Sequence, residues 1–429
     1  MTEETKKTRI KNRWMVVLAA VVLELALGAL YAYSVYQDQF DAQGYPAWQG
    51  QLVYSLQVVS FAIMVIYAGK LRAKLGVQKM LLISAILMGG GYVLSAINPL
   101  NWVFLLFTLG IVAGIGIGMT YTLPIGIGMK WFPDKKGLVT GLGMAGFGGG
   151  SLIWIYAGDA IFAAGLGLNA AFIIYGVCFA AMIMFAYFYL QEAPDGYVPE
   201  GYEPPEQEVL ETGEVKAEIE IQSKQMIKTQ QFWFLFYTFL AGAAAGLMVI
   251  GQAKTIPPQF LTDSGMNQSA ADAITSFTAA AVYPFFNACG RIGYGALGDK
   301  IGWKKSVLLM NGLQVVAMAL ATTLMSYSAG LIVLMAILAL NYGGNFSLMP
   351  SATSKLFGEK TLDENYGIVF FAYGVGGLLG PNLGGILQDA GLITVAFVIS
   401  AVMIAIAVIL TYLIKPVDET ELDSAEKSE

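Results

Sequence analysis

Stretches of about twenty consecutive apolar residues recur along this 429-residue chain. A helix needs roughly 20 mostly apolar residues to cross about 30 Å of hydrocarbon. Twelve stretches have that character: residues 14–36, 51–69, 79–97, 102–124, 138–161, 169–190, 231–253, 272–297, 306–326, 329–349, 366–387 and 393–414. Only 13% of the residues are charged, against roughly a quarter in soluble proteins. The sequence therefore predicts an all-α membrane protein with twelve transmembrane helices, surrounded by the lipid bilayer.

The positions of lysine and arginine predict the orientation. Cytoplasmic loops of membrane proteins carry an excess of these residues. With both termini placed in the cytoplasm, every lysine and arginine except Lys254 and Arg291 lies in a terminal segment or a cytoplasmic loop. The first apolar stretch is too long for the core of a signal peptide. We therefore expect a multi-pass protein of the cell (inner) membrane with both termini cytoplasmic.

The chain repeats itself once. "GKLRAKLGVQK" at 69–79 matches "GALGDKIGWKK" at 295–305, a shift of 226 residues, and an acidic, proline-containing segment separates the two copies. Such duplicated halves place a binding site near the membrane midplane between them. The predicted division is into two pseudo-symmetric six-helix bundles, a linker and a tail. Their ranges are 1–190 and 231–415 for the bundles, 191–230 for the cytoplasmic linker and 416–429 for the cytoplasmic tail.

The residues do not predict a metal site, a disulfide framework or a cofactor-binding motif. The chain has no histidine, and Cys178 and Cys289 both lie in apolar stretches, so neither a metal motif nor a disulfide framework is expected. "GLGMAG" at 141–146 matches a dinucleotide-binding pattern, but it lies inside an apolar helix, where close helix packing is the better interpretation. We expect no enzyme activity, no metal, no cofactor and no nucleic-acid partner.

One charged residue interrupts the apolar pattern. "NACGRIGYG" at 287–295 places Arg291 inside the eighth stretch, one helical turn after Asn287. Burying an arginine at bilayer depth costs at least ~2.5–3.5 kcal/mol. A guanidinium presents donors in a fork that matches a carboxylate, so Arg291 and Asn287 are predicted to bind an anionic substrate. The alternative is a structural cation paired with Glu24 or Asp159.

The two repeated loops carry a known signature. The pattern of glycines and charges at 295–305, with Asp299 at its acidic position, resembles the signature of the major facilitator superfamily, although Ala73 replaces the aspartate in the first copy. "KWFPDKKGLVTG" at 130–141 and "NYG" at 365–367 resemble the oxalate:formate antiporter and bacterial monocarboxylate transporter family. The resemblance implies the major facilitator fold and alternating access. The signature loops at 69–79 and 295–305, with Asp299 and the segment from Lys130 to Lys136, are expected to latch the cytoplasmic side.

The resemblance also suggests a substrate class. In the similar family an arginine at the position of Arg291 binds the substrate carboxylate, and the oxalate exchanger carries a second cation, a lysine, at the position matched by Tyr373. A tyrosine cannot neutralise a second charge, so a monocarboxylate is expected. Lys254 leaves alternatives open. It attracts anions at the outer mouth, extends toward water at a helix end, or acts as a second substrate cation, which would allow a dicarboxylate.

The remaining candidates are polar or aromatic residues in the apolar stretches. A tyrosine offers an acid both an apolar ring and a hydroxyl. The substrate-contact candidates are Tyr31, Tyr33, Tyr121, Gln252 and Tyr342, together with Asn341 and Asn345. The proton-linked monocarboxylate transporters, to which this family is similar, carry an aspartate at the position of Asn287. An asparagine cannot take up a proton, so Glu24 is the candidate proton carrier, with a structural role as the alternative.

Together these features predict a secondary transporter of small monocarboxylates such as lactate, pyruvate or formate. The coupled species, a proton or an exchanged anion, is left open. The first alternative is an oxalate:formate antiporter that uses Arg291 and Lys254 together, and a second is a non-transporting receptor on a transporter fold.

Overall fold

The computed structural model describes residues 12–133, 136–194, 197–199, 220–358 and 361–417. Within these ranges the chain forms helices and no strand. The prediction of an all-α chain is confirmed.

Six helical segments form the first half of the chain. The first runs from α1 (Trp14–Leu27) through the 3₁₀ segment η1 (Gly28–Ala32) into α2 (Ser34–Ala42). The next two are α3 (Ala47–Leu75) and the combination of α4 (Val77–Ser84), η2 (Ala85–Gly89) and α5 (Gly90–Ser95). The fourth combines α6 (Trp102–Leu105), η3 (Leu106–Ala113), α7 (Gly114–Thr120) and α8 (Leu123–Trp131), and the last two are α9 (Lys136–Ala163) and α10 (Leu168–Tyr189).

The second half follows the same plan after the short helix α11 (Ser223–Met226). It begins with α12 (Gln230–Gly251) and the short α13 (Pro257–Asp263), followed by α14 (Gln268–Phe277), the π-helical segment η4 (Thr278–Val282) and α15 (Tyr283–Ile301). The remaining helices are α16 (Trp303–Ala319), α17 (Ala321–Met325), α18 (Ser328–Phe357), α19 (Leu362–Asp389) and α20 (Ile393–Leu413).

Most of these segments are long and apolar enough to cross a membrane. Nine helical segments within the described ranges meet that description by length and composition. The three other predicted spans, 138–161, 272–297 and 306–326, are also helical, in α9, in α14 to α15 and in α16 to α17. All twelve predicted stretches are therefore helices.

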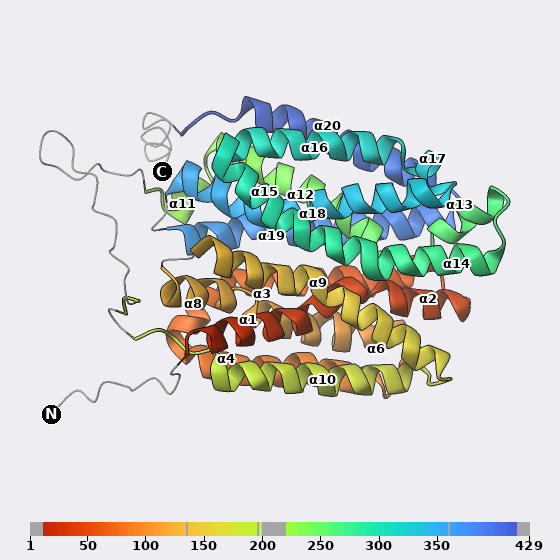
Figure 1. Ribbon diagram of the computed structural model, residues 1–429, viewed down its shortest axis with the longest axis horizontal. Coiled ribbons are helices and arrows are strands. Elements are labelled where there is room, and N and C mark those ends of the chain that lie inside the picture. The colour runs from red at the N-terminus through yellow and green to blue at the C-terminus, as the bar shows by residue number, and fades with distance from the viewer. Residues whose placement is uncertain (1–11, 134–135, 195–196, 200–219, 359–360, 418–429) are drawn as a thin grey trace, which may run out of the picture.

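Figure 1 shows the helices of the first half grouped on one side of the molecule and those of the second half on the other. We call them the first half and the second half. Helix α1 begins and α20 ends at the left of Figure 1, which we call the terminal end; α2, α13, α14 and α17 lie at the opposite, distal end. The main contacts between the halves join α3 to α19 and α9 to α15.

The segment between the halves contacts the second half. Backbone and side-chain hydrogen bonds join Asn365 of α19 to Ile221 and Ser223, at 2.8 Å each. Within its described residues this segment contains the short helix α11. Residues 200–219 of the predicted linker and 418–429 of the predicted tail lie outside the described ranges, and the exact domain boundaries stay a prediction.

Candidate functional site

Helix α15 lies close against α18, and this contact fixes the backbone that carries Arg291. Gly290 faces the carbonyl oxygen of Leu340, and a Cβ at Gly290 would collide with that oxygen. About two turns further along α18, the Ser347 hydroxyl donates to the carbonyl oxygen of Arg291 at 2.5 Å. Small residues at such positions let two helix backbones approach closely. The guanidinium therefore projects from a rigid position toward the first half.

The Arg291 side chain is buried, with 2% of its surface exposed. Its Nε donates to Oδ1 of Asn287 at 3.1 Å, as the four-residue spacing predicted. The guanidinium carbon lies 4.3 Å from the ring centre of Phe346 and 5.6 Å from that of Phe147. The two terminal nitrogens, Nη1 and Nη2, have no hydrogen-bond partner. Among the described residues, no carboxylate oxygen forms an ion pair with the guanidinium within 4 Å.

These contacts offset only part of the cost of burying the charge. A cation over an aromatic face gains about 2 kcal/mol when it is desolvated, and a hydrogen bond to a charged group about 1.5–3 kcal/mol. Two donor nitrogens still lack the partners that a buried charge requires. An anion with two adjacent oxygens would satisfy both of them.

A buried carboxylate lies near this cation but does not pair with it. Glu24 of α1 is 2% exposed, and its Oε2 has no hydrogen-bond partner. It lies against Gly146 of α9 and interacts electrostatically with Arg291 and Tyr121. Within the part of the chain that the structure describes, Glu24 is the only buried acidic side chain. Arg291 and Glu24 are therefore a buried cation and a buried carboxylate that do not form an ion pair.

Tyrosine hydroxyls from three helical segments meet beside the guanidinium. The Tyr342 hydroxyl of α18 lies 3.0 Å from that of Tyr31 in η1 and 3.5 Å from that of Tyr373 in α19. Tyr31 and Tyr342 both interact electrostatically with Arg291, as does Tyr121, whose hydroxyl has no partner. We call Tyr31, Tyr121, Tyr342 and Tyr373 the tyrosine cluster. It contributes hydroxyls from both halves.

Two predicted contacts lie elsewhere. Tyr33 donates its hydroxyl to the carbonyl oxygen of Gly50 at 2.6 Å and stacks on Tyr54. Gln252 donates to Oε1 of Gln388 at 2.8 Å.

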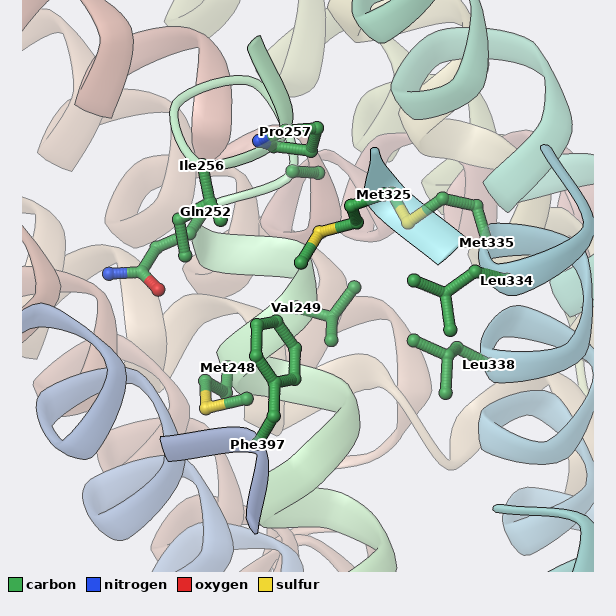
Figure 2. A pocket seen from close by; sticks show the side chains of 11 residues that line it. Met248, Val249, Gln252, Ile256, Pro257, Met325, Leu334, Met335, Leu338 and Phe397 are labelled. Atoms are coloured by element: carbon green, nitrogen blue, oxygen red, sulfur yellow. The ribbon is translucent and has the colours of Figure 1, made fainter. Parts of the chain in front are cut away.

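Gln252 also borders a cavity in the second half, whose other lining side chains are apolar; in Figure 2 its amide points away from them. The structure does not join Tyr33 or Gln252 to the tyrosine cluster. Of the two further asparagine candidates, Asn341 accepts from Tyr294 at 2.6 Å and donates to Gln314 at 3.0 Å. Asn345 donates to the carbonyl oxygen of Asn341 at 3.2 Å.

The charged candidates away from Arg291 have different surroundings. Lys254, which follows α12, forms an ion pair with Asp159 of α9. Asp159, one of the two predicted partners of Arg291, is therefore paired with a different cation. Asp299 is exposed on the last turns of α15. At the terminal end, Arg72 and Lys130 both form ion pairs with Glu192, at 2.5 Å and 3.4 Å. Glu192 follows α10, the last helix of the first half, so these contacts do not join the two halves. Residues 134–135 of the predicted latch lie outside the described ranges.

Sequence reasoning missed the aromatic faces around the guanidinium. Phe147 of α9 and Phe346 of α18 flank Arg291, while Phe61 and Phe370 pack on the ring of Tyr121. Phenylalanine is common in membrane helices, so it gives no signal by itself. The position of Phe346 could have indicated its role, because it lies within the polar "NYGGNFS" stretch of α18.

Comparison with known proteins gives a consistent result. Residues 13–277 and 253–429 match the model of the Major Facilitator Superfamily. An uncharacterized transporter of this type from Escherichia coli, YhjX, is 28% identical over 369 residues, covering 86% of each chain. The oxalate:formate antiporter of Oxalobacter formigenes is 26% identical over 409 residues, covering 94% of this chain and 92% of its own. Monocarboxylate transporter 9 of Rattus norvegicus is 24% identical over 441 residues, covering 85% and 83%.

Proposed function

Because the chain belongs to the Major Facilitator Superfamily, a family of membrane transporters rather than enzymes, we propose that it carries a small monocarboxylate across the membrane by alternating access. The proposed cargo is an acid of the size of lactate, pyruvate or formate. Arg291 binds its carboxylate between the two halves, and the distal and terminal ends open in turn.

The unsatisfied guanidinium of Arg291 carries this proposal. Nη1 and Nη2 are buried and have no hydrogen-bond partner, while Nε donates to Oδ1 of Asn287. A carboxylate that bridges Nη1 and Nη2 makes two parallel charge-assisted hydrogen bonds. Since an isolated buried charge is costly, the anion stabilises the closed, dry state more than the open states, and this difference favours occlusion around the substrate.

The tyrosine cluster supports a substrate with a single charge. Its hydroxyls can donate to a substrate oxygen, and its rings can contact a methyl group, but tyrosine supplies no second positive charge. Tyr373, at the position matched by the lysine of the oxalate exchanger, lies 3.5 Å from the Tyr342 hydroxyl. A second carboxylate in this place would be buried without a counter-ion, which is strongly unfavourable.

The alternative is an oxalate:formate antiporter that uses Lys254 as the second cation. The relative from Oxalobacter formigenes keeps this alternative open. Lys254, however, is paired with Asp159, so binding a substrate carboxylate would require that ion pair to break first.

Counterflow in proteoliposomes tests the choice of substrate. The purified protein is reconstituted in vesicles loaded with L-lactate, and uptake of radiolabelled L-lactate is measured beside that of radiolabelled oxalate. We expect lactate uptake and no oxalate uptake. Oxalate uptake with lactate inert would contradict the proposal, and counterflow of neither acid would favour the non-transporting receptor.

The position of Gly148 in α9 gives a test of the Arg291 geometry. A Cβ at Gly148 would lie 2.8 Å from Oδ1 of Asn287 and 3.1 Å from Nε of Arg291. The Gly148→Ala protein should therefore lose the hydrogen bond between these side chains and displace the guanidinium. Since a hydrogen bond to a charged group contributes about 1.5–3 kcal/mol, we expect the KM for lactate to rise roughly tenfold or more.

Gly149→Ala is the matched control, because a Cβ at Gly149 meets no atom within 4 Å. It makes the same change in the adjacent residue of the same helix and should leave the KM unchanged. Equal KM values in the two variants would show that the orientation of Arg291 does not depend on this contact.

The lack of a second cation also leads to a gain-of-function prediction. In Tyr373→Lys, a lysine replaces a fully buried tyrosine of the tyrosine cluster and supplies the missing charge. We expect oxalate counterflow to appear in this variant and lactate counterflow to fall, because a monoanion then leaves one buried cation unsatisfied. Tyr373→Met, which removes the hydroxyl without adding charge, should transport no oxalate. A folded Tyr373→Lys protein without oxalate counterflow would contradict the single-charge explanation.

Charge balance suggests a proton as the coupled species. With Glu24 ionised, the empty site holds one positive and one negative charge. Binding a monocarboxylate adds a second negative charge, and a proton on Glu24 restores neutrality. Moving net charge through the hydrocarbon region is costly, so the neutral states are the ones that cross easily: empty with Glu24 ionised, or loaded with Glu24 protonated. We therefore propose proton symport, with exchange of anions as its alternative.

The orientation follows from the distribution of basic residues. We propose that the terminal end faces the cytoplasm and the distal end faces outward in the cell (inner) membrane, because the lysines and arginines outside the apolar stretches, apart from Lys254, lie on the terminal side in the predicted topology.

A further inference from the structure

Polar contacts between described residues, both hydrogen bonds and ion pairs, join the two halves from the tyrosine cluster to the distal end. No such bond joins the halves at the terminal end within the ranges that the structure describes. The conformation is therefore one that is closed at the distal end.

One of these contacts caps a helix of the opposite half. The two carboxylate oxygens of Asp389, the last residue of α19, accept from the backbone N–H groups of Ala47 at 2.9 Å and Trp48 at 3.1 Å. These are the first two residues of α3, and the residue before them, Pro46, provides no side-chain cap. The first N–H groups of a helix have no partner within the helix, and a carboxylate there also interacts favourably with the helix dipole.

Three other helices are capped by a side chain of their own sequence. Asn101 caps α6, Thr229 caps α12 and Asn267 caps α14, each accepting from a backbone N–H three residues later. By contrast, α3 receives its side-chain cap from the second half. Its amino end is therefore capped only while the halves are together.

Three further contacts lie near this cap. Gln51 of α3 donates to the carbonyl oxygen of Gly251 at 3.1 Å, and Asn382 of α19 donates to the Ser55 hydroxyl at 2.8 Å. The third is the ion pair between Lys254 and Asp159. We call these contacts, together with the Asp389 cap, the distal seal.

We propose that the distal seal is the gate on this side of the transporter, and that Asp389 sets its stability by capping α3 across the boundary between the halves. Opening the distal end exposes the amino end of α3 and removes its cap. The inference rests on the proposed alternation of the two halves but is independent of the substrate.

A side chain beneath the seal reports its opening. Val58 of α3 is fully buried and packs against Gly377 of α19, so a thiol at this position reacts with a reagent from the distal side only when the seal opens. The two native cysteines, Cys178 and Cys289, are first replaced by alanine. The rate of reaction of Val58→Cys with a membrane-impermeant maleimide is then measured in right-side-out and inverted vesicles. Ser264→Cys, in the exposed turn after α13, identifies the preparation that presents the distal end.

Removing the cap should speed this reaction. Loss of an N-cap, with the loss of a charge at the helix end, changes an equilibrium by roughly fivefold to tenfold. We therefore expect Asp389→Ala to raise the labelling rate of Val58→Cys from the distal side by that factor. Asp389→Asn keeps an acceptor oxygen and should give a smaller rise, about twofold to threefold. This variant is used in the test if Asp389→Ala fails to accumulate in the membrane.

Asp272→Ala is the matched control. Asp272 is an exposed aspartate of α14 near the distal end, and its carboxylate accepts from Gln268 of the same helix. Its removal makes the same change in charge without touching α3 and should leave the labelling rate unchanged. If Asp389→Ala, or Asp389→Asn where it replaces that variant, gives the rate of the parent protein, Asp389 does not stabilise the gate and the proposal is wrong.

The parent protein separates this proposal from the function on which it rests. Labelling of the parent Val58→Cys from the distal side, slow but measurable, is expected if the halves alternate. If that thiol never reacts from the distal side in the parent or in any variant, alternating access itself fails, and the gate fails with it.

Discussion

The Arg291→Gln protein is expected to show no lactate counterflow above that of empty vesicles. Removing one partner of a buried, hydrogen-bonded charge pair costs about 2–5 kcal/mol, which corresponds to a loss of roughly 30-fold to several thousandfold in affinity. Glutamine retains a donor but not the charge or the paired geometry of the guanidinium. Arg291→Lys, which retains the charge but not the fork, should fall between Arg291→Gln and the wild type.

Thermal unfolding separates this loss from misfolding. In the empty protein, Arg291 is a buried charge with two unsatisfied nitrogens, so Arg291→Gln should unfold at the same temperature as the wild type or above it. Lactate should raise the Tm of the wild type and leave that of Arg291→Gln unchanged, because only binding to the folded state stabilises it.

Lys254→Gln is the informative comparison. Because the charge of Lys254 is paired with Asp159, its removal should change lactate counterflow by no more than about tenfold. We expect this change to come from the altered distal seal and not from the substrate site. A loss as complete as that of Arg291→Gln would instead support two substrate cations and a dicarboxylate.

The local features of this molecule could be predicted from the sequence because they follow from the helix itself. The apolar stretches became helices, and Asn287 lies beside Arg291 because four residues make about one turn. Boundaries were less accurate. The stretch predicted at 51–69 is the helix 47–75, since polar residues extend a helix beyond the apolar core at little cost.

Contacts between the halves could not be predicted in the same way. The hydroxyls of Tyr31 and Tyr342 lie 3.0 Å apart although 311 residues separate them, and no periodicity within either helix encodes that approach. The ion pair of Lys254 with Asp159 and the cap that Asp389 provides for α3 were missed for the same reason. Composition marks these residues as polar, but only the packing of one half on the other selects their partners.

The strongest effect of a single carboxyl group is expected at Glu24. One pH unit corresponds to about 1.4 kcal/mol, so an electroneutral symporter that moves one proton per lactate can accumulate lactate about tenfold across a gradient of one unit. The Glu24→Gln protein should accumulate none, while its counterflow stays within several-fold of the wild type. The measurement is the ratio of internal to external lactate in proteoliposomes at a fixed pH difference, beside counterflow at equal pH.

The two activities separate because glutamine mimics the protonated carboxyl. In the Glu24→Gln protein, the loaded site is neutral and can cross in either direction, so exchange continues. The empty site then carries the uncompensated charge of Arg291, and its return through the hydrocarbon region becomes slow. The neighbouring groups are Arg291 of α15, which keeps its charge throughout, and Tyr121 of the tyrosine cluster, which stays neutral near pH 7. Neither can replace Glu24 as the carrier of the proton.

Asp263→Asn, which neutralises an exposed carboxylate at the end of α13, is the control and should accumulate lactate as the wild type does. Full accumulation by Glu24→Gln would show that the proton is carried elsewhere. A wild-type protein that exchanges lactate rapidly but never accumulates it would identify an anion exchanger. The empty site would then be unable to cross even with Glu24 ionised, and the balance between the charges of Glu24 and Arg291 would serve the structure of the core rather than the coupling.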